Sequence, residues 1–150
     1  MEKYEITNNK EFMTMLLKTT LFDTFETREL LIKTAFTSVM DGRRNKDYFS
    51  SDEKDSSSYL LTWNEIRPYA YSLVHGNKLP TYFKIILSTN ADKTAAISHD
   101  VTTFFLNIEF QDNQITCTTA TAYKAFTMDK SAEKAWDTRI QDFLFKYHFL

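Results

Sequence analysis

The strongest constraint on the fold is an alternating stretch in the C-terminal half of the chain. The run "VTTFFLNIEF" (residues 101–110) is followed by "QDNQ" and then by "ITCTTATAYKAF" (residues 115–126). In the first run, apolar side chains recur at every second position and share one face of an extended strand; these are Phe104, Leu106, Ile108 and Phe110. The second run is rich in threonine and small residues. The pattern predicts an antiparallel hairpin with one apolar face.

A second hairpin is predicted around Asp41 and Gly42. Residues 27–40 are rich in β-forming residues and mostly alternate between apolar and polar side chains. Asp-Gly between two strand-like runs favours a type I′ turn, which needs positive φ at both central residues. We therefore expect the chain to reverse at Asp41-Gly42 and to return as a strand over residues 43–49.

A helix is predicted over residues 62–75. Thr62 precedes Glu65 by three residues, which is the spacing of a capping box, and an apolar stripe follows. Gly76 follows this span, and glycine is common at the position just after the end of a helix. Pro68 lies inside this span, and a proline in a helix interior removes a hydrogen bond. Either the helix bends at Pro68, or it begins nearer to that residue.

Helical periodicity also marks both ends of the chain. Asn8 and Glu11 have capping-box spacing and precede a short apolar stripe. A final helix is predicted to start near residues 129–131, with one apolar face made of Ala132, Trp136, Ile140, Phe143, Leu144 and Tyr147. Short strands are predicted at "KYEIT" and after Pro80, and "NADKTAAISHD" is predicted to be a loop. A mobile polar loop is predicted at about residues 50–58.

Together these elements predict one α+β domain over residues 1–150. Helices interspersed with hairpins favour a mainly antiparallel sheet with about three helices, the long C-terminal helix being packed on one face. A chain of this length buries about 70% of the surface that it exposes when unfolded, which is enough for a core. With 13 Phe, 8 Tyr and 2 Trp, we expect that core to be rich in aromatic side chains.

Composition excludes several classes of protein. The formal net charge is −2, so a wholly basic nucleic-acid binder is not expected, although a local basic patch stays open. We expect no signal peptide, because the start is charged and polar, and no apolar run approaches the roughly 18 residues that a membrane helix needs. The single cysteine, Cys117, excludes a disulfide within the chain. We expect a cytoplasmic protein that has no membrane partner.

Four stretches carry a resemblance to a known family: "FDTF", "DGRRNKDYF", "WNEIRPYAYSLVHG" and "LPTYFK". The most specific pieces are Asp41-Gly42-Arg43, Asn45-Lys46 and Trp63-x-x-Ile66-Arg67-Pro68. They resemble a family of small bacterial proteins known only as a domain of unknown function. The resemblance implies a stand-alone bacterial cytoplasmic domain, and it brings no activity and no catalytic residue to this chain.

The residue types that usually carry catalysis or metal binding form no recognisable motif. His75, His99 and His148 lie far apart in the sequence, without the spacing of a metal site. Cys117 lies within a predicted strand and lacks a local activating signature, so we expect it to be buried and structural. Two isolated glycines cannot form a phosphate-binding glycine loop. We therefore expect no cofactor, no metal and no catalytic residue.

The arginines after Gly42 are not explained by turn geometry. We expect Arg43 and Arg44 at the surface, where they are either ordinary surface charge or bind an anion through paired hydrogen bonds. The full candidate binding site consists of Arg43, Arg44, Asn45, Tyr48, Trp63 and Arg67. Our leading interpretation is a non-catalytic binding or interaction module, with an Arg/aromatic patch that recognises an anionic ligand or a protein partner.

Other interpretations stay open. An enzyme of unfamiliar type would use His99, Asp100 or Glu109 in a cleft. The many aromatic side chains would alternatively line a pocket for a hydrophobic ligand, or stack against single-stranded nucleic acid beside the arginines. The apolar C-terminal tail either tucks into the fold or forms a homodimer, because its large side chains cannot all face one side of a helix.

Overall fold

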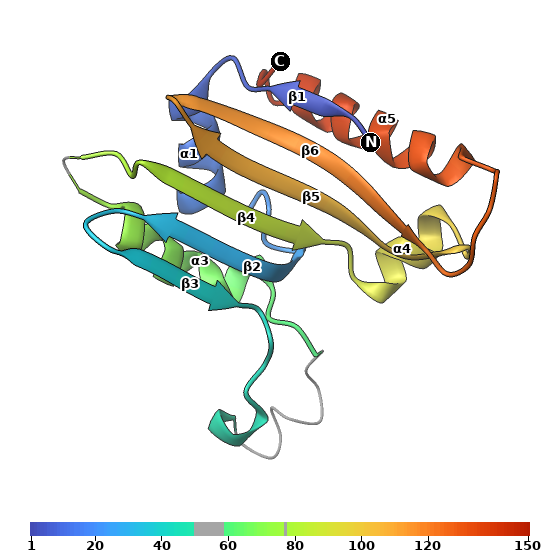
Figure 1. Ribbon diagram of the computed structural model, residues 1–150, viewed down its shortest axis with the longest axis horizontal. Helices are drawn as coiled ribbons and strands as arrows, with labels where there is room; N and C mark the ends of the chain where they lie inside the picture. The colour runs from blue at the N-terminus through green and yellow to red at the C-terminus, as the bar shows by residue number, and fades with distance from the viewer. Residues whose placement is uncertain (50–58, 77) are drawn as a thin grey trace.

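The computed structural model describes residues 1–49, 59–76 and 78–150. They contain a six-stranded antiparallel sheet with the strand order β1-β6-β5-β4-β2-β3 (Figure 1). Its strands are β1 (Lys3–Glu5), β2 (Glu26–Lys33), β3 (Thr37–Asp41), β4 (Tyr82–Ser88), β5 (Val101–Gln111) and β6 (Gln114–Tyr123). The loop predicted at residues 50–58 lies outside the described residues.

Helices cover one side of this sheet. The described α-helices are α1 (Asn9–Lys18), α3 (Trp63–Val74), α4 (Ala91–Ile97) and α5 (Ser131–Lys146). A short 3₁₀ helix, η1 (Lys46–Tyr48), lies beyond the end of β3 and away from the sheet (Figure 1). Figure 1 shows α1, α3 and α5 behind the sheet, with α4 beside its right-hand end. The predicted α+β class and the C-terminal helix on one face are confirmed, although the described residues contain four α-helices where about three were expected.

The core lies between the helices and one face of the sheet. On β5, Phe104, Leu106 and Ile108 are fully buried, as their alternation predicts. The buried residues of α5 are Ala132, Trp136, Ile140 and Leu144. The indole N–H of Trp136 donates to the carbonyl of Phe105 at 2.9 Å, so this large apolar side chain enters the core with its polar atom satisfied. Burial of these side chains is the main stabilising contribution to the fold.

The predicted hairpin at "QDNQ" is confirmed. β5 and β6 pair from Val101 opposite Tyr123 to Gln111 opposite Gln114, with one register shift between Val101 and Thr103. Between them Asp112 and Asn113 have φ angles of 53° and 62°. Positive φ at both central residues is the condition for a type I′ turn, which matches the twist of the flanking strands.

The hairpin predicted at Asp41-Gly42 is wrong. The chain reverses earlier, after β2, so Lys33 pairs with Thr37. At that turn the N–H of Thr34 donates to the carbonyl of Phe36 at 2.9 Å. The alternating run at residues 27–40 is therefore two strands, because pairing between β2 and β3 overrides the Asp-Gly signal. No return strand forms over residues 43–49, where the structure has η1 instead.

Gly42 is required by a close backbone approach. A Cβ atom on this residue would lie 1.5 Å from the carbonyl oxygen of Thr27. The Gly42 N–H donates to the carbonyl of Arg28 at 3.1 Å, and the Gly42 carbonyl accepts from the N–H of Leu61 at 2.7 Å. The absence of a side chain lets the segment after β3 lie directly against the start of β2.

The helix α3 begins at Trp63 and continues through Pro68 to Val74. The capping box predicted at its start is present, with the Thr62 N–H donating to a carboxylate oxygen of Glu65 at 3.1 Å. Pro68 therefore does not start the helix. At its other end Gly76 has a φ of 152°, which only glycine adopts readily.

The segment predicted as a loop after β4 contains the helix α4. The Asn90 side chain caps it by accepting from the N–H of Lys93 at 2.8 Å. The buried Thr94 donates its hydroxyl to the carbonyl of Asn90 at 2.8 Å. A helix of seven residues is too short to show a clear apolar stripe, so periodicity could not reveal it.

The C-terminal tail tucks into the fold. Phe149 is fully buried, and its ring packs edge-on against Phe12 at 5.0 Å between centroids. Its carbonyl accepts from the N–H of Thr7 at 2.9 Å, which joins the two ends of the chain. Only Phe145 among the large apolar tail residues is strongly exposed, at 55%. The homodimer through the tail stays a prediction.

We expect Gly42→Ala to lower the free energy of unfolding by about 3 kcal/mol, because the new methyl group would overlap the Thr27 carbonyl. Gly42→Asn should be at least as harmful. If Gly42 were needed for a left-handed turn instead, asparagine would destabilise the protein less than alanine, because asparagine tolerates positive φ better. Urea denaturation of both variants decides between a close backbone approach and a left-handed turn. A smaller loss of stability with asparagine than with alanine would contradict the close approach.

Candidate functional site

A groove lies where β3, η1 and α3 meet. Its cavity volume is about 510 Å³, and its lining includes Asp41, Arg43, Asn45, Tyr48 and Tyr69. We call it the Arg43 groove. Three residues of the predicted binding site line it, namely Arg43, Asn45 and Tyr48. The structure thus brings together half of the predicted site and gives the other half different roles.

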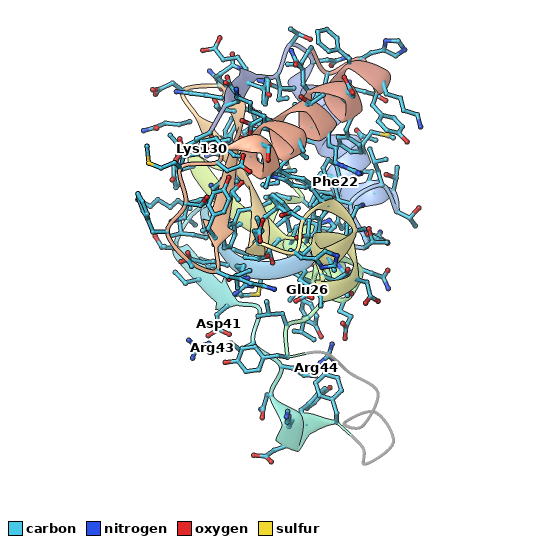
Figure 2. All side chains as sticks on the ribbon, turned by 90° about the vertical axis from the view of Figure 1, so that its right-hand side faces the viewer. Phe22, Glu26, Asp41, Arg43, Arg44 and Lys130 are labelled. Carbon is cyan, nitrogen blue, oxygen red and sulfur yellow. The ribbon has the colours of Figure 1, made fainter. Side chains whose placement is uncertain are left out.

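Arg44 is not exposed, contrary to the prediction. Its side chain is only 6% exposed and forms a bidentate ion pair with Glu65, with both N–O distances at 2.9 Å. The guanidinium also lies 4.9 Å from the centroid of the Phe49 ring. These contacts hold the segment after β3 against α3. Figure 2 shows Arg43 and Arg44 directed to opposite sides of this segment.

Glu65 joins the capping box to this ion pair. One of its oxygens accepts from the N–H of Thr62 at 3.1 Å and from the Thr62 hydroxyl at 3.2 Å. Hydrogen bonds from Arg44 lower the pKa of Glu65, and this effect exceeds the opposing effect of partial burial. The carboxylate is therefore held in its charged form by the same contacts that fix the start of α3.

Arg67 and Trp63 also have structural roles, so the prediction that they join the binding site is not supported by their positions. Arg67 forms a bidentate ion pair with Asp23, at 2.9 and 3.0 Å. Trp63 is fully buried, and its indole N–H donates to the carbonyl of Leu16 at 2.9 Å. These contacts fasten α3 to the segments that precede β2.

Arg43 and Asn45 remain at the surface. Arg43 is exposed, and its backbone N–H is held by the Asp41 carboxylate at 3.0 Å. The Asn45 side chain accepts from the N–H of Asp47 at 3.3 Å and so caps η1. Of the three predicted arginines, only Arg43 is among the described residues that line the Arg43 groove.

Sequence reasoning missed two exposed tyrosines at this site. Tyr59 and Tyr69 are each 63% exposed, and Tyr48 is 80% exposed. Tyr69 lines the groove together with Tyr48, and the Tyr59 carbonyl accepts from the N–H of Arg44 at 2.9 Å. At helical spacing Tyr69 falls on the apolar stripe predicted for residues 62–75, and only the packing of α3 shows that it is exposed. A signal for Tyr59 was absent, because it follows the polar run at 50–58.

The open edge of β3 adjoins the groove. β3 is the last strand of the sheet, and among the described strands it pairs only with β2. Its sequence, "TSVMD", contains neither lysine nor proline, the residues that commonly block an edge. Met40 and Asp41 at its end line the groove, so the open edge and the groove form one continuous surface.

The residues of the enzyme alternative are not brought together. His99 and Asp100 are exposed just before β5, whereas Glu109 lies near its far end. The separation is roughly 30 Å, because an antiparallel strand rises about 3.4 Å per residue. Glu109 instead accepts from the Tyr82 hydroxyl at 2.8 Å. Burial and this carboxylate raise the pKa of Tyr82 to about 12.

Other kinds of site are not found in the described part of the chain. No group of three or more His, Cys, Asp or Glu side chains there is arranged to hold a metal ion. Cys117 is buried as predicted, and burial raises the pKa of its thiol, which leaves it unreactive. None of the described helices combines the length and apolar character that crossing a membrane requires.

A family model for DUF5721, described as a family of unknown function, matches residues 15–149. The chain belongs to this family. The match covers the Arg43 groove and all six residues of the predicted site, and it confirms the resemblance to a family without a known activity. No curated protein and no solved structure matches the chain. The function of the DUF5721 fold must therefore be argued from its geometry.

The two neighbouring arginines provide a matched test of this description. We expect Arg44→Met to lower the free energy of unfolding by about 2 kcal/mol, because it removes charge-assisted hydrogen bonds and leaves Glu65 without its partner. Arg43→Met should change it by less than about 0.5 kcal/mol, since Arg43 is exposed. Urea denaturation at neutral pH measures both. Equal losses in the two variants would contradict the assigned roles.

The same pair predicts a dependence on pH. Because the folded protein lowers the pKa of Glu65, the stabilisation is complete above the ordinary glutamate value and is lost as the pH falls through the lower, folded value. Arg44→Met should therefore lose less stability than wild type between neutral pH and about pH 3. Denaturation curves across this range test the expectation. Parallel pH profiles would show that the ion pair is not formed in solution.

Proposed function

We propose that the protein is a non-catalytic interaction module of the bacterial cytoplasm, and that an extended segment of a protein partner binds along β3 and into the Arg43 groove. One observation carries this proposal. The edge of β3, with which no other described strand pairs, runs directly into a groove that is lined by two exposed tyrosines and the exposed Arg43. A surface of this kind offers both backbone hydrogen bonds and side-chain pockets to a partner.

The strand edge would supply affinity. Alternate residues of an edge strand direct their N–H and C=O groups away from the sheet, where an added strand can pair with them. The opposite edge of the sheet is less suitable, because β1 has only three residues and carries Lys3 and Glu5. In β3, Val39 is 61% exposed on the face of the sheet that the helices leave open. It would pack against apolar side chains of the partner strand.

The Arg43 groove would supply specificity. Tyrosine and arginine are enriched in the energetically important parts of protein interfaces. Tyr48 and Tyr69 present apolar rings that keep a polar hydroxyl, and Arg43 would pair with a carboxylate of the partner. A free oligoanion is a poorer candidate, because the other two arginines are already paired and Asp41 lines the same groove.

The cytoplasmic location is part of the proposal. A fold of this size that relies on a packed core, with one buried thiol in place of disulfides, is typical of a reducing compartment. Epitope-tagged protein expressed in a bacterial host should fractionate with the cytoplasm. Recovery from the periplasm would contradict this part of the proposal.

Selection of random linear peptides on the full-length protein tests the interaction. We expect the selected peptides to combine apolar residues at alternate positions with an acidic residue. Arg43→Glu should weaken their binding at least about tenfold, which corresponds to 1.4 kcal/mol. Binding should also slow amide hydrogen exchange in β3, because its free N–H groups become paired.

Arg139→Glu is the matched control, because it makes the same change of charge at an exposed position on α5. It should leave peptide affinity unchanged. Two results would contradict the proposal: failure to select any peptide that binds, or peptides that bind both charge variants equally and leave the exchange of β3 unaltered.

A further inference from the structure

A second hollow lies at the opposite end of α3 from the Arg43 groove. It lies between α1, the C-terminal end of α3 and the ends of the interior strands β4, β5 and β6, and its volume is about 680 Å³. Pockets for small molecules commonly measure roughly 300–1,000 Å³. We call it the α1–α3 pocket. It shares no lining residue with the Arg43 groove.

The floor of the α1–α3 pocket is apolar. Phe83 and Phe110 come from neighbouring strands, and their rings stack at 5.4 Å between centroids with an interplanar angle of 14°. Ile115 continues this floor on β6. On the sides, Leu17 of α1 faces the pocket together with Val74 of α3. Such a surface favours aliphatic chains, because burying methylene groups is the main source of affinity available there.

The rim of the pocket is cationic. Lys10 and Lys18 are two helical turns apart on the same face of α1, with Thr14 between them. His75 lies at the end of α3, where its ring stacks on Tyr71 at 5.0 Å. Among the described residues that line the pocket there is no Asp or Glu, although acidic residues outnumber Lys and Arg by 20 to 18 in the whole chain. The rim therefore carries positive charge, whereas the whole molecule has a negative net charge.

The two lysines are available to a ligand. Both are exposed, and neither forms an ion pair with a carboxylate of the described residues. The ammonium group of Lys18 lies 6.0 Å from the centroid of the Tyr71 ring. A cation placed on an apolar wall in this way can meet an anionic group at the mouth while the rest of the ligand lies on the floor.

We propose that the α1–α3 pocket binds a single-chain amphiphile with a carboxylate headgroup, a free long-chain fatty acid. The aliphatic chain lies over the nearly buried rings of Phe83 and Phe110 and against the more accessible side chains of Val74 and Leu79. The carboxylate meets Lys10 or Lys18. Two features of one surface carry this assignment. The floor is apolar, which selects a hydrocarbon, and the charged side chains that the structure describes on the rim are lysines, which select an anion.

Calorimetric titration of the full-length protein with sodium dodecanoate, below its micellar concentration, tests the proposal. We expect saturable binding of one molecule. Each methylene added between octanoate and dodecanoate should tighten binding by roughly threefold. Dodecyltrimethylammonium has the same chain and the opposite charge, and it should bind at least about tenfold more weakly. Acetate should not bind, because it lacks the chain.

Substitutions of the rim lysines test whether dodecanoate binds in the α1–α3 pocket. Lys10→Glu/Lys18→Glu should weaken dodecanoate binding at least about tenfold, which is a change of 1.4 kcal/mol. The control Lys124→Glu/Lys134→Glu makes the same change of charge at exposed positions outside the pocket and should have no effect. All four lysines are exposed, so the variants should fold. Lys10→Gln/Lys18→Gln provides a second variant of the rim, which removes the positive charges without adding negative ones. Amide NMR shifts should change at Leu17, Val74 and Phe110.

Several outcomes would overturn the proposal. One is the absence of dodecanoate binding, and another is equal binding of the cationic and anionic amphiphiles. A third is an equal effect of the two pairs of lysine variants. If dodecanoate does not bind and light scattering shows a dimer that Lys10→Glu/Lys18→Glu dissociates, the pocket receives a second copy of the chain. None of these outcomes depends on whether a peptide binds at β3, so the two proposals fail separately.

Discussion

The carboxylate of Glu65 is the contact on which the region around the Arg43 groove depends. It caps α3 through Thr62 and at the same time holds the guanidinium of Arg44 with two hydrogen bonds. One side chain therefore joins the start of a helix to the segment that leaves β3. Gly42 permits this arrangement, because only a residue without Cβ can lie against Thr27 there. With Arg44 directed inward, Arg43 is left facing outward.

The helix α3 separates two surfaces of different chemistry. Near its N-terminal end lies the Arg43 groove, which mixes tyrosines with charges of both signs and continues into an open strand edge. Near its C-terminal end lies the α1–α3 pocket, which is apolar with a cationic rim. The first suits an extended protein segment and the second suits an amphiphilic anion. The buried Trp63 and the Arg67–Asp23 pair hold the helix that both surfaces share.

The sequence predicted correctly those parts of the structure that depend on residues close together in the chain. The hairpin at residues 101–123, the capping box before α3 and the buried face of α5 all follow from spacing within a few residues. Asp41-Gly42 was misjudged, because the same dipeptide suits a turn or a close approach, and strand pairing decides between them. Of the six residues of the predicted binding site, three line the Arg43 groove. The partners of Arg44 and Arg67 lie 21 and 44 residues away in the sequence, so no local pattern could reveal those ion pairs.

The most direct test of this account is the pKa of the Glu65 side chain, measured by NMR titration of its carboxylate carbon. The account predicts a value below the ordinary glutamate pKa, because two hydrogen bonds from Arg44 stabilise the charged form. In Arg44→Met the value should rise towards the ordinary one, whereas Arg43→Met should leave it unchanged. A Glu65 pKa at or above the ordinary value in the wild-type protein would contradict the inward role of Arg44, and with it the geometry of the groove.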